Sequence, residues 1–206
     1  RSLAGTIDES AMIEMNADVE IHGLSENEAA GRFLMARRGM EVSVRRRDIV
    51  RDITRYTIEH VYMVSISLAA AMLVAIPLGG LASRRASTAH VVLGVAGVIQ
   101  TIPSIALLVL LIRPVSYFSD ELGFPQAVIA LFLYSLLPIV RNTHAGLCGI
   151  APELRESAIA LGLSPWGRMI RIELPLASPS ILAGIKTAAV INVGFATLGG
   201  FIGAGG

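Results

Sequence analysis

Hydrophobic and polar positions divide the chain into a polar beginning and a largely apolar remainder. Residues 1–60 are rich in Arg, Glu and Asp, whereas residues 61–206 consist mainly of apolar runs separated by short charged segments. The runs that hold no Asp, Glu, Lys or Arg cover residues 61–82, 86–112, 122–140 and 187–206. The last run extends back to Leu174 if Lys186 is allowed within it. About 20 apolar residues in an α-helix cross the hydrocarbon core of a bilayer, so the pattern predicts four membrane-spanning helices.

The predicted fold class is an all-α membrane protein. Polar backbone groups in lipid must be satisfied inside the spanning element, and the sequence lacks the alternating segments of a β-barrel. Pro77, Pro103 and Pro138 fall inside the runs and predict kinks, because neighbouring helices can satisfy the carbonyls that proline frees. Small residues let helices approach closely. The glycines expected to do so are Gly94, Gly97, Gly194, Gly199, Gly200 and Gly203.

Charges in the short connecting segments predict the orientation of these helices. Basic residues at 84–85 and within 141–171 favour the cytoplasm, and acidic residues at 120–121 lie between two spans on the other side. This alternation places residues 1–60 outside. The arginines at 45–47 oppose it, because they lie shortly before the first span on the predicted outer side. Three segments against one favour a multi-pass protein of the cell membrane with an extracytoplasmic N-terminus.

A polar island at residues 150–175 separates the third and fourth runs and predicts two short helices. Pro152 suits the first helical position, and Glu153 and Glu156 follow where acidic side chains favour the helix dipole. Gly162 is a good helix stop. One face of this first helix carries small and apolar residues at helical spacing. They are Leu154, Ser157, Ala158 and Leu161.

The second helix of the island is expected to start at Ser164 and Pro165, which suit the N-cap and the first helical position. It is expected to end before Pro175. The side chains expected to pack against another surface are Leu154, Ala158, Leu161 and Trp166. The structural alternative is an ordinary solvated cytoplasmic loop, which would not need such a regular pattern.

This island resembles the EAA loop of ABC-importer permeases. Glu156-Ser157-Ala158 is followed by three residues, Gly162, nine residues and then Ile172-Glu173-Leu174-Pro175. All spacings of the pattern match, and Ser157 stands where the loop usually has alanine. The resemblance implies a type I, MetI-like permease core whose cytoplasmic coupling helix docks on a separate ATPase subunit, which binds ATP and Mg in place of this chain. The implied coupling residues are Glu153, Leu154, Glu156, Ser157, Ala158, Leu161, Gly162, Trp166, Ile172, Leu174 and Pro175.

Further blocks resemble the permeases of glycine betaine and other osmoprotectants. They are Gln100-Thr101-Ile102-Pro103-Ser104, residues 183–190, residues 196–198 and residues 201–206. The resemblance implies import of glycine betaine, choline, carnitine, proline betaine or a related zwitterion, by an assembly that includes a second permease copy in a homodimer or heterodimer. In that family the chain continues beyond Gly206 with at least one more span. The aromatic residues are scattered and form no predicted cage for a quaternary ammonium.

Residues 1–40 contain Leu3-Ala4-Gly5-Thr6-Ile7, then Met12, Met15-Asn16 and Val19, and then Ala29 and Phe33-Leu34. This pattern resembles the tail of an osmoprotectant substrate-binding protein. The resemblance implies a short α/β tail of a binding domain fused ahead of the permease. Residues 8–16 and 25–38 are each expected to form an amphipathic helix, the second with a capping box of Ser25 and Glu28. Residues 18–21 alternate weakly, like a strand. Residues 41–60 are then a linker and interfacial helix, and 61–206 the permease domain, truncated at its C-terminus. The alternative is a cytoplasmic or interfacial extension.

Polar residues inside the spans are candidates for the translocation pathway. Gln100, Pro103 and Asn192 are assigned to it. Asn142 and His144 are expected at the solvated cytoplasmic end of the third span, and Lys186 is expected to reach toward the cytoplasmic edge. The single cysteine, Cys148, excludes an internal disulfide and is expected to be a small apolar residue on a helix.

Two other classes of function compete with the importer. A secondary transporter or channel would use no ATPase and would leave the island unexplained. A membrane enzyme would need a cluster of His, Asp or Glu in the spans, which is not seen, and no P-loop motif is present. The net charge of +1 gives no electrostatic case for binding nucleic acid. The expected partners are membrane lipid, the ATPase, the second permease and the binding domain. No cofactor or metal is expected to be held by this chain.

Overall fold

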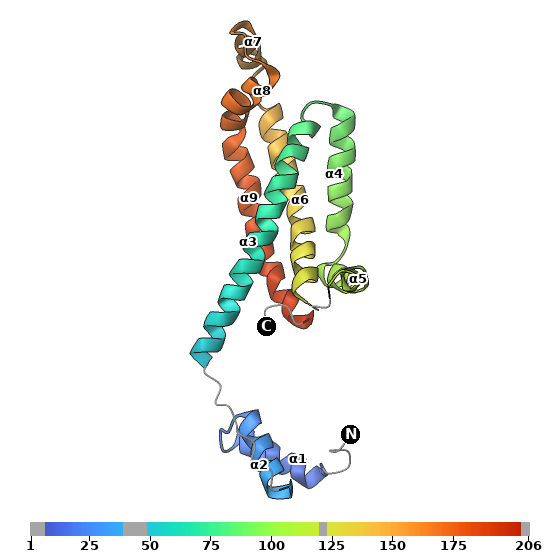
Figure 1. Ribbon diagram of the computed structural model, residues 1–206, viewed down its shortest axis with the longest axis vertical. Coiled ribbons are helices and arrows are strands. Elements are labelled where there is room, and N and C mark those ends of the chain that lie inside the picture. Colours follow the sequence, from blue (N-terminus) through green and yellow to red (C-terminus); the bar gives the residue numbers. More distant parts are fainter. Residues whose placement is uncertain (1–6, 39–48, 120–122, 203–206) are drawn as a thin grey trace. The chain divides into compact units, whose positions relative to one another are not determined.

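A computed structural model describes residues 7–38, 49–119 and 123–202 of the chain (Figure 1). The chain divides into two compact units, Arg1–Asp52 and Ile53–Gly206, each of which is described here by itself. The arginines at 45–47, the acidic pair at 120–121 and the last four residues lie outside the described ranges.

The first unit contains a pair of helices, α1 (Glu9–Glu20) and α2 (Glu26–Arg38). The side chain of Asp8 caps α1 by accepting the Ala11 N–H at 2.8 Å. The predicted capping box of α2 is confirmed: the Ser25 N–H donates to Glu28 Oε2 at 2.9 Å, and the Glu28 N–H donates to Ser25 Oγ at 3.3 Å.

Both helices of this unit were expected, but the strand at residues 18–21 is wrong. Residues 18–20 form the last turn of α1, and the Ile21 N–H donates to the Ala17 carbonyl at 2.9 Å. A lone strand would leave these backbone groups without ladder partners, whereas the helix satisfies them locally. In its described part the tail is therefore helical and not α/β.

The second unit is a bundle of long helices. Its elements are α3 (Ile49–Ala82, of which the first residues belong to the first unit), α4 (Ala86–Thr101), α5 (Ser104–Ser116), α6 (Phe124–Cys148), α7 (Pro152–Ala160), α8 (Pro165–Arg168), the π-helical turn η1 (Met169–Glu173), α9 (Leu174–Ala196) and the 3₁₀ segment η2 (Thr197–Ile202). In Figure 1, α3, α6 and α9 run side by side, and α7 and α8 lie at the end of the bundle where α3 turns into α4.

Within the described ranges, three helical stretches are long and apolar enough to cross a membrane: Ile49–Ala82, Phe124–Cys148 and Pro165–Gly200. The second predicted span is interrupted at Pro103, where the sequence predicted a kink. This run forms α4 and α5, which are bent by 99° at a break before Pro103. Proline has no N–H and disfavours helical geometry in the residue before it, and Ile102 is extended, with ψ at 126°. Pro77 and Pro138, by contrast, stay inside unbroken helices.

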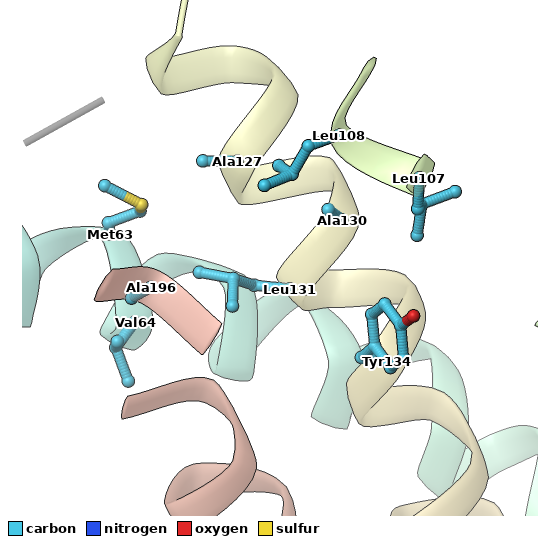
Figure 2. Packing of buried hydrophobic residues seen from close by; sticks show 9 residues of the cluster. All are labelled: Met63, Val64, Leu107, Leu108, Ala127, Ala130, Leu131, Tyr134 and Ala196. Atoms are coloured by element: carbon cyan, nitrogen blue, oxygen red, sulfur yellow. The ribbon is translucent and has the colours of Figure 1, made fainter. Parts of the chain in front are cut away.

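The core of the bundle is built around α6. Figure 2 shows its largest apolar cluster, in which α6 side chains meet residues from α3, α5 and α9. The members of this cluster are Met63, Val64, Leu107, Leu108, Ala127, Ala130, Leu131, Tyr134 and Ala196. The Tyr134 ring meets the Phe195 ring edge-on, with centroids 4.8 Å apart.

Close helix contact occurs at glycines other than those predicted. A Cβ on Gly184 of α9 would lie 2.7 Å from the Pro138 carbonyl of α6, and one on Gly146 would lie 2.7 Å from Ser180 Cβ. Four of the predicted glycines have nothing of this chain within 4 Å of such a Cβ, and they are Gly94, Gly97, Gly194 and Gly200. The prediction is wrong for these four within the chain, because their helix faces point away from its core.

Candidate functional site

The polar island folds as two short helices joined by a glycine turn, as predicted. Helix α7 begins at Pro152 with Glu153 in its first turn, while Glu156 follows one turn later. Gly162 ends it with φ at +76°, a left-handed conformation that favours glycine. In that turn the Gly162 N–H donates to the Ile159 carbonyl at 2.9 Å. The backbone at Gly162 therefore fixes how the chain leaves α7.

Helix α8 begins at the predicted cap, because Ser164 Oγ accepts the Gly167 N–H at 3.1 Å. The expected end before Pro175 is wrong: α8 continues through η1 directly into α9. A proline in a regular helix loses one hydrogen bond and clashes with the carbonyl four residues earlier. In the wider π-turn just before Pro175, the Leu174 N–H donates to the Met169 carbonyl, five residues back.

Several large apolar side chains of α7, α8 and the adjoining residues are exposed. Leu161 is 80% exposed and Trp166 is 73% exposed. Leu154, Ile159 and Ile170 are exposed as well. Of the other implied coupling residues, Glu153, Glu156, Ser157 and Pro175 are exposed, whereas Ile172 and Leu174 are half-buried. We call the exposed residues Leu154, Ile159, Leu161, Trp166 and Ile170 the α7–α8 apolar set.

Ala158 does not share this exposed position. It is 1% exposed and is the only residue of α7 that is buried. Residues of this chain therefore cover the Ala158 side chain, which the sequence predicted to pack against the surface of a partner. Small size at this position lets α7 lie close to the residues that cover it.

Beneath α7 lies a buried carboxylate, that of Glu173, which sequence reasoning did not single out. Its side chain is 1% exposed and pairs with three arginines, Arg84, Arg155 and Arg168. The available signal was an acidic residue at the edge of an apolar run, where an isolated charge is costly. We call Glu173 and these arginines the Glu173 cluster.

The residues assigned to the translocation pathway are held inside helix contacts. The Gln100 amide donates to the Tyr134 carbonyl at 2.8 Å, and the Tyr134 hydroxyl donates to the Ile102 carbonyl beside Pro103. A cavity of about 10 Å³ adjoins this break, which is room for about one water. The elbow between α4 and α5 is thus fastened to α6 by two hydrogen bonds.

Asn192 is fully buried between α3 and α6. Its Nδ2 donates to Ser67 Oγ at 3.3 Å, and Ser135 Oγ donates to its Oδ1 at 3.1 Å. The amide thus links three helices. Buried polar groups of this kind are normally hydrogen-bonded, so the position is explained by packing within the bundle.

Of the remaining polar candidates, Asn142 and His144 lie near the α7 end of α6, whereas Lys186 lies near the middle of α9. Asn142 Nδ2 donates to the Pro138 carbonyl at 2.8 Å, and His144 Nε2 lies 3.6 Å from the sulfur of the exposed Cys148. The side chain of Lys186 is exposed. Within the described ranges, no group of three or more His, Cys, Asp or Glu side chains is placed to hold a metal ion.

A multi-span helical core with a short amphipathic helix between two spans defines a membrane permease component. Residues 71–206 match the family of binding-protein-dependent transport system inner membrane components, and the chain belongs to this family. The chain is 44% identical over 150 residues to the osmoprotectant import permease protein OsmW of Salmonella typhimurium (strain LT2), covering 73% of this chain and 70% of the relative. It is 41% identical over 152 residues to the choline transport system permease protein OpuBB of Bacillus subtilis (strain 168), covering 73% and 67%.

A solved structure supports the fold. The inward-facing MetNI methionine ABC transporter contains a chain that matches with a TM-score of 0.70 and 24% identity, over 79% of each chain. This likeness confirms the predicted MetI-like, all-helical permease core. As a member of an inner-membrane family with several apolar helices, the chain is a membrane protein.

Proposed function

We propose that the chain is the permease component of an ATP-driven importer for glycine betaine, choline, carnitine or a related quaternary-ammonium osmoprotectant. The names of the relatives support this class of substrate. ATP and Mg are bound by a separate ATPase subunit, so this chain is not itself an enzyme. Two permease copies form the transmembrane path.

The observation that carries the proposal is the α7–α8 apolar set. Large apolar side chains that are exposed close together in the sequence indicate a protein interaction site. Trp166 and Leu161 are large side chains that can fill pockets on a partner, and aromatic anchors dominate such interfaces. The left-handed turn at Gly162 sets how the chain leaves α7, which suits a helix that docks in a cleft of the ATPase.

The first unit is proposed to be the end of a substrate-binding domain on the outer side of the membrane. Its capped helices and their Asp18–Arg32 ion pair at 3.2 Å form a compact unit separate from the bundle. A binding domain must meet its solute outside, which agrees with the extracytoplasmic N-terminus indicated by the short connecting segments.

Substitutions at Gly162 test the docking role. Valine is strongly disfavoured at φ +76°, whereas asparagine tolerates this region. Nothing lies within 4 Å of a Cβ at this position, so backbone strain and not a clash distinguishes the two variants. In the full-length protein we expect Gly162→Val to lose co-purification with the ATPase and uptake of labelled glycine betaine, and Gly162→Asn to keep both.

A matched control is Gly23→Val, since Gly23 has φ at +67°, is equally open and lies in the other unit. It should leave ATPase co-purification intact. Uptake in vesicles should require ATP and persist when a protonophore removes the ion gradient. Uptake that needs only the gradient, or an ATPase that stays bound to Gly162→Val, would contradict the proposal.

A further inference from the structure

The Glu173 cluster joins parts of the chain that are far apart in sequence. Arg84 lies in the turn after α3, Arg155 on α7 and Arg168 on α8. Arg84 Nη2 lies 2.5 Å from Glu173 Oε2, and Arg168 Nε lies 3.1 Å from Oε1. Both carboxylate oxygens are thus engaged, at the point where η1 passes into α9.

Arg155 connects α7 to this carboxylate and to the end of α6. Its Nη2 donates to the Leu147 carbonyl at 2.5 Å. Its Nε lies 3.5 Å from Glu173 Oε1, within ion-pair range but without a hydrogen bond. Since Ala158 is the only buried residue of α7, Arg155 supplies the main polar link between this helix and the spans.

The π-turn η1 sets the direction of the Glu173 side chain. In an α-helix, residues three or four apart face each other, but Arg168 and Glu173 are five apart. The π-helical hydrogen bond, from residue i to i+5, aligns such a pair, and η1 spans Met169–Glu173. Such π-turns are frequent at functional sites. Here the turn brings the carboxylate under α7.

Stability alone gives a weak reason for this arrangement. Replacing a buried ion pair with apolar side chains is often neutral or stabilising, because both charges must leave water. Three guanidiniums around one carboxylate also repel one another. What the cluster supplies is geometry, since one buried group fixes α7, α8, α9 and the turn after α3 together.

We infer that Glu173 is the positioning residue that makes α7 and α9 move as one body, with Arg155 and Arg84 carrying the displacement to α6 and α3. The inference rests on the proposed docking of α7 on an ATPase. When the ATPase displaces α7, the cluster passes the motion to the spans. Without the carboxylate, α7 still presents its apolar side chains but is no longer fixed to α9.

The test uses the full-length protein with its ATPase partner in lipid nanodiscs and proteoliposomes. Glu173→Gln keeps the side-chain shape and removes the charge. We expect ATPase binding to stay unchanged while glycine betaine uptake per ATP hydrolysed falls by about 5-fold to 150-fold, the usual range of coupling effects. Unchanged uptake per ATP in a complex that assembles would overturn the inference but leave the docking proposal intact.

A direct readout is the distance between spin labels at Ala160 of α7 and Leu182 of α9, both exposed, in a Cys148→Ser background. The distribution should stay narrow with and without ATP, and Glu173→Gln should broaden it. A distribution of equal width in the variant would also overturn the inference. Labels report on rigidity whether or not the ATPase binds, so this measurement separates the cluster's role from the docking role.

If Glu173→Gln fails to accumulate in the membrane, two milder variants test the same inference. Arg84→Gln and Arg155→Gln each remove one partner and leave Glu173 paired with two guanidiniums. Arg85→Gln is the matched control, because Arg85 is adjacent to Arg84, is exposed and has no contact with Glu173 among the described residues. Uptake per ATP should fall in the first two and not in the control, and equal values in all three would refute the role of the cluster.

Discussion

Gln100 and Pro138 should behave as one energetic unit. Pro138 has no N–H, so the Tyr134 carbonyl, four residues earlier in α6, lacks its helical donor. The Gln100 amide donates to that carbonyl at 2.8 Å from another helix. Gln100→Leu removes the donor and keeps most of the side-chain volume. It leaves a carbonyl without a partner inside the bundle.

The magnitude follows from two estimates that differ. A buried acceptor left unsatisfied costs about 1–3 kcal/mol in soluble proteins, whereas side-chain hydrogen bonds between membrane helices average about 0.6 kcal/mol. We expect Gln100→Leu to lower the unfolding free energy by about 1 kcal/mol, a value between these two estimates, because Gln100 is half-buried at the elbow between α4 and α5. In a Pro138→Ala background the restored N–H satisfies Tyr134, so Gln100→Leu should then cost almost nothing.

The assay is a double-mutant cycle on unfolding free energy, measured by denaturant titration in detergent. The expected coupling energy is about 1 kcal/mol, well above the roughly 0.3–0.5 kcal/mol within which distant sites are additive. Thr101→Val is the control, since the Thr101 hydroxyl bonds to the Val98 carbonyl of its own helix. It should be additive with Pro138→Ala. Additivity of Gln100→Leu with Pro138→Ala would refute the reasoning.

Two further predictions concern the interior of the bundle. Asn192→Leu should lower the unfolding free energy by about 1 kcal/mol, because the hydroxyls of Ser67 and Ser135 lose their shared amide. Glycine betaine affinity should stay unchanged, and a weaker affinity at unchanged stability would instead place Asn192 in the pathway. Gly184→Ala should destabilise the protein by about 1–3 kcal/mol through overpacking. Gly194→Ala should not, because a Cβ at Gly194 meets nothing within 4 Å. Equal melting temperatures for the two variants would contradict the packing argument.

The features that could be predicted from the sequence are those that depend on neighbours along the chain. Pro152 at the start of α7, Gly162 at its end and the Ser164 cap of α8 obey rules of local backbone geometry. The long apolar runs likewise need only a length and a composition. The island motif implies a docking role through its resemblance to the EAA loop, but only the structure shows which of its side chains are exposed. Ala158 illustrates the difference, because helical spacing alone does not tell which face meets the bundle.

The sequence predicted a kink at Pro103, but it could not tell which prolines leave a helix unbroken, because this depends on the groups that satisfy the freed carbonyls. Pro138 stays within α6, where Gln100 satisfies the freed carbonyl. Pro179 stays within α9, where the Ser178 hydroxyl donates to the Pro175 carbonyl at 2.8 Å. At Pro103 the helix breaks, and the Tyr134 hydroxyl satisfies the Ile102 carbonyl in the opened turn. The same residue type thus gives a continuous helix or an elbow according to the groups, in its own helix or in another, that lie near the proline.

The Glu173 cluster shows a further limit of sequence reasoning. Arg84, Arg155 and Arg168 contribute to the positive charge from which the sequence predicts cytoplasmic segments, and this explanation of their presence is sufficient by itself. In the structure each of them also pairs with one buried carboxylate. Charge bias requires only that basic residues lie on one side of the membrane, whereas a rigid link between α7 and α9 requires them at particular positions. Moving an arginine within its segment would preserve the orientation and break the link, so substitutions at Arg84 and Arg85 should separate the two requirements.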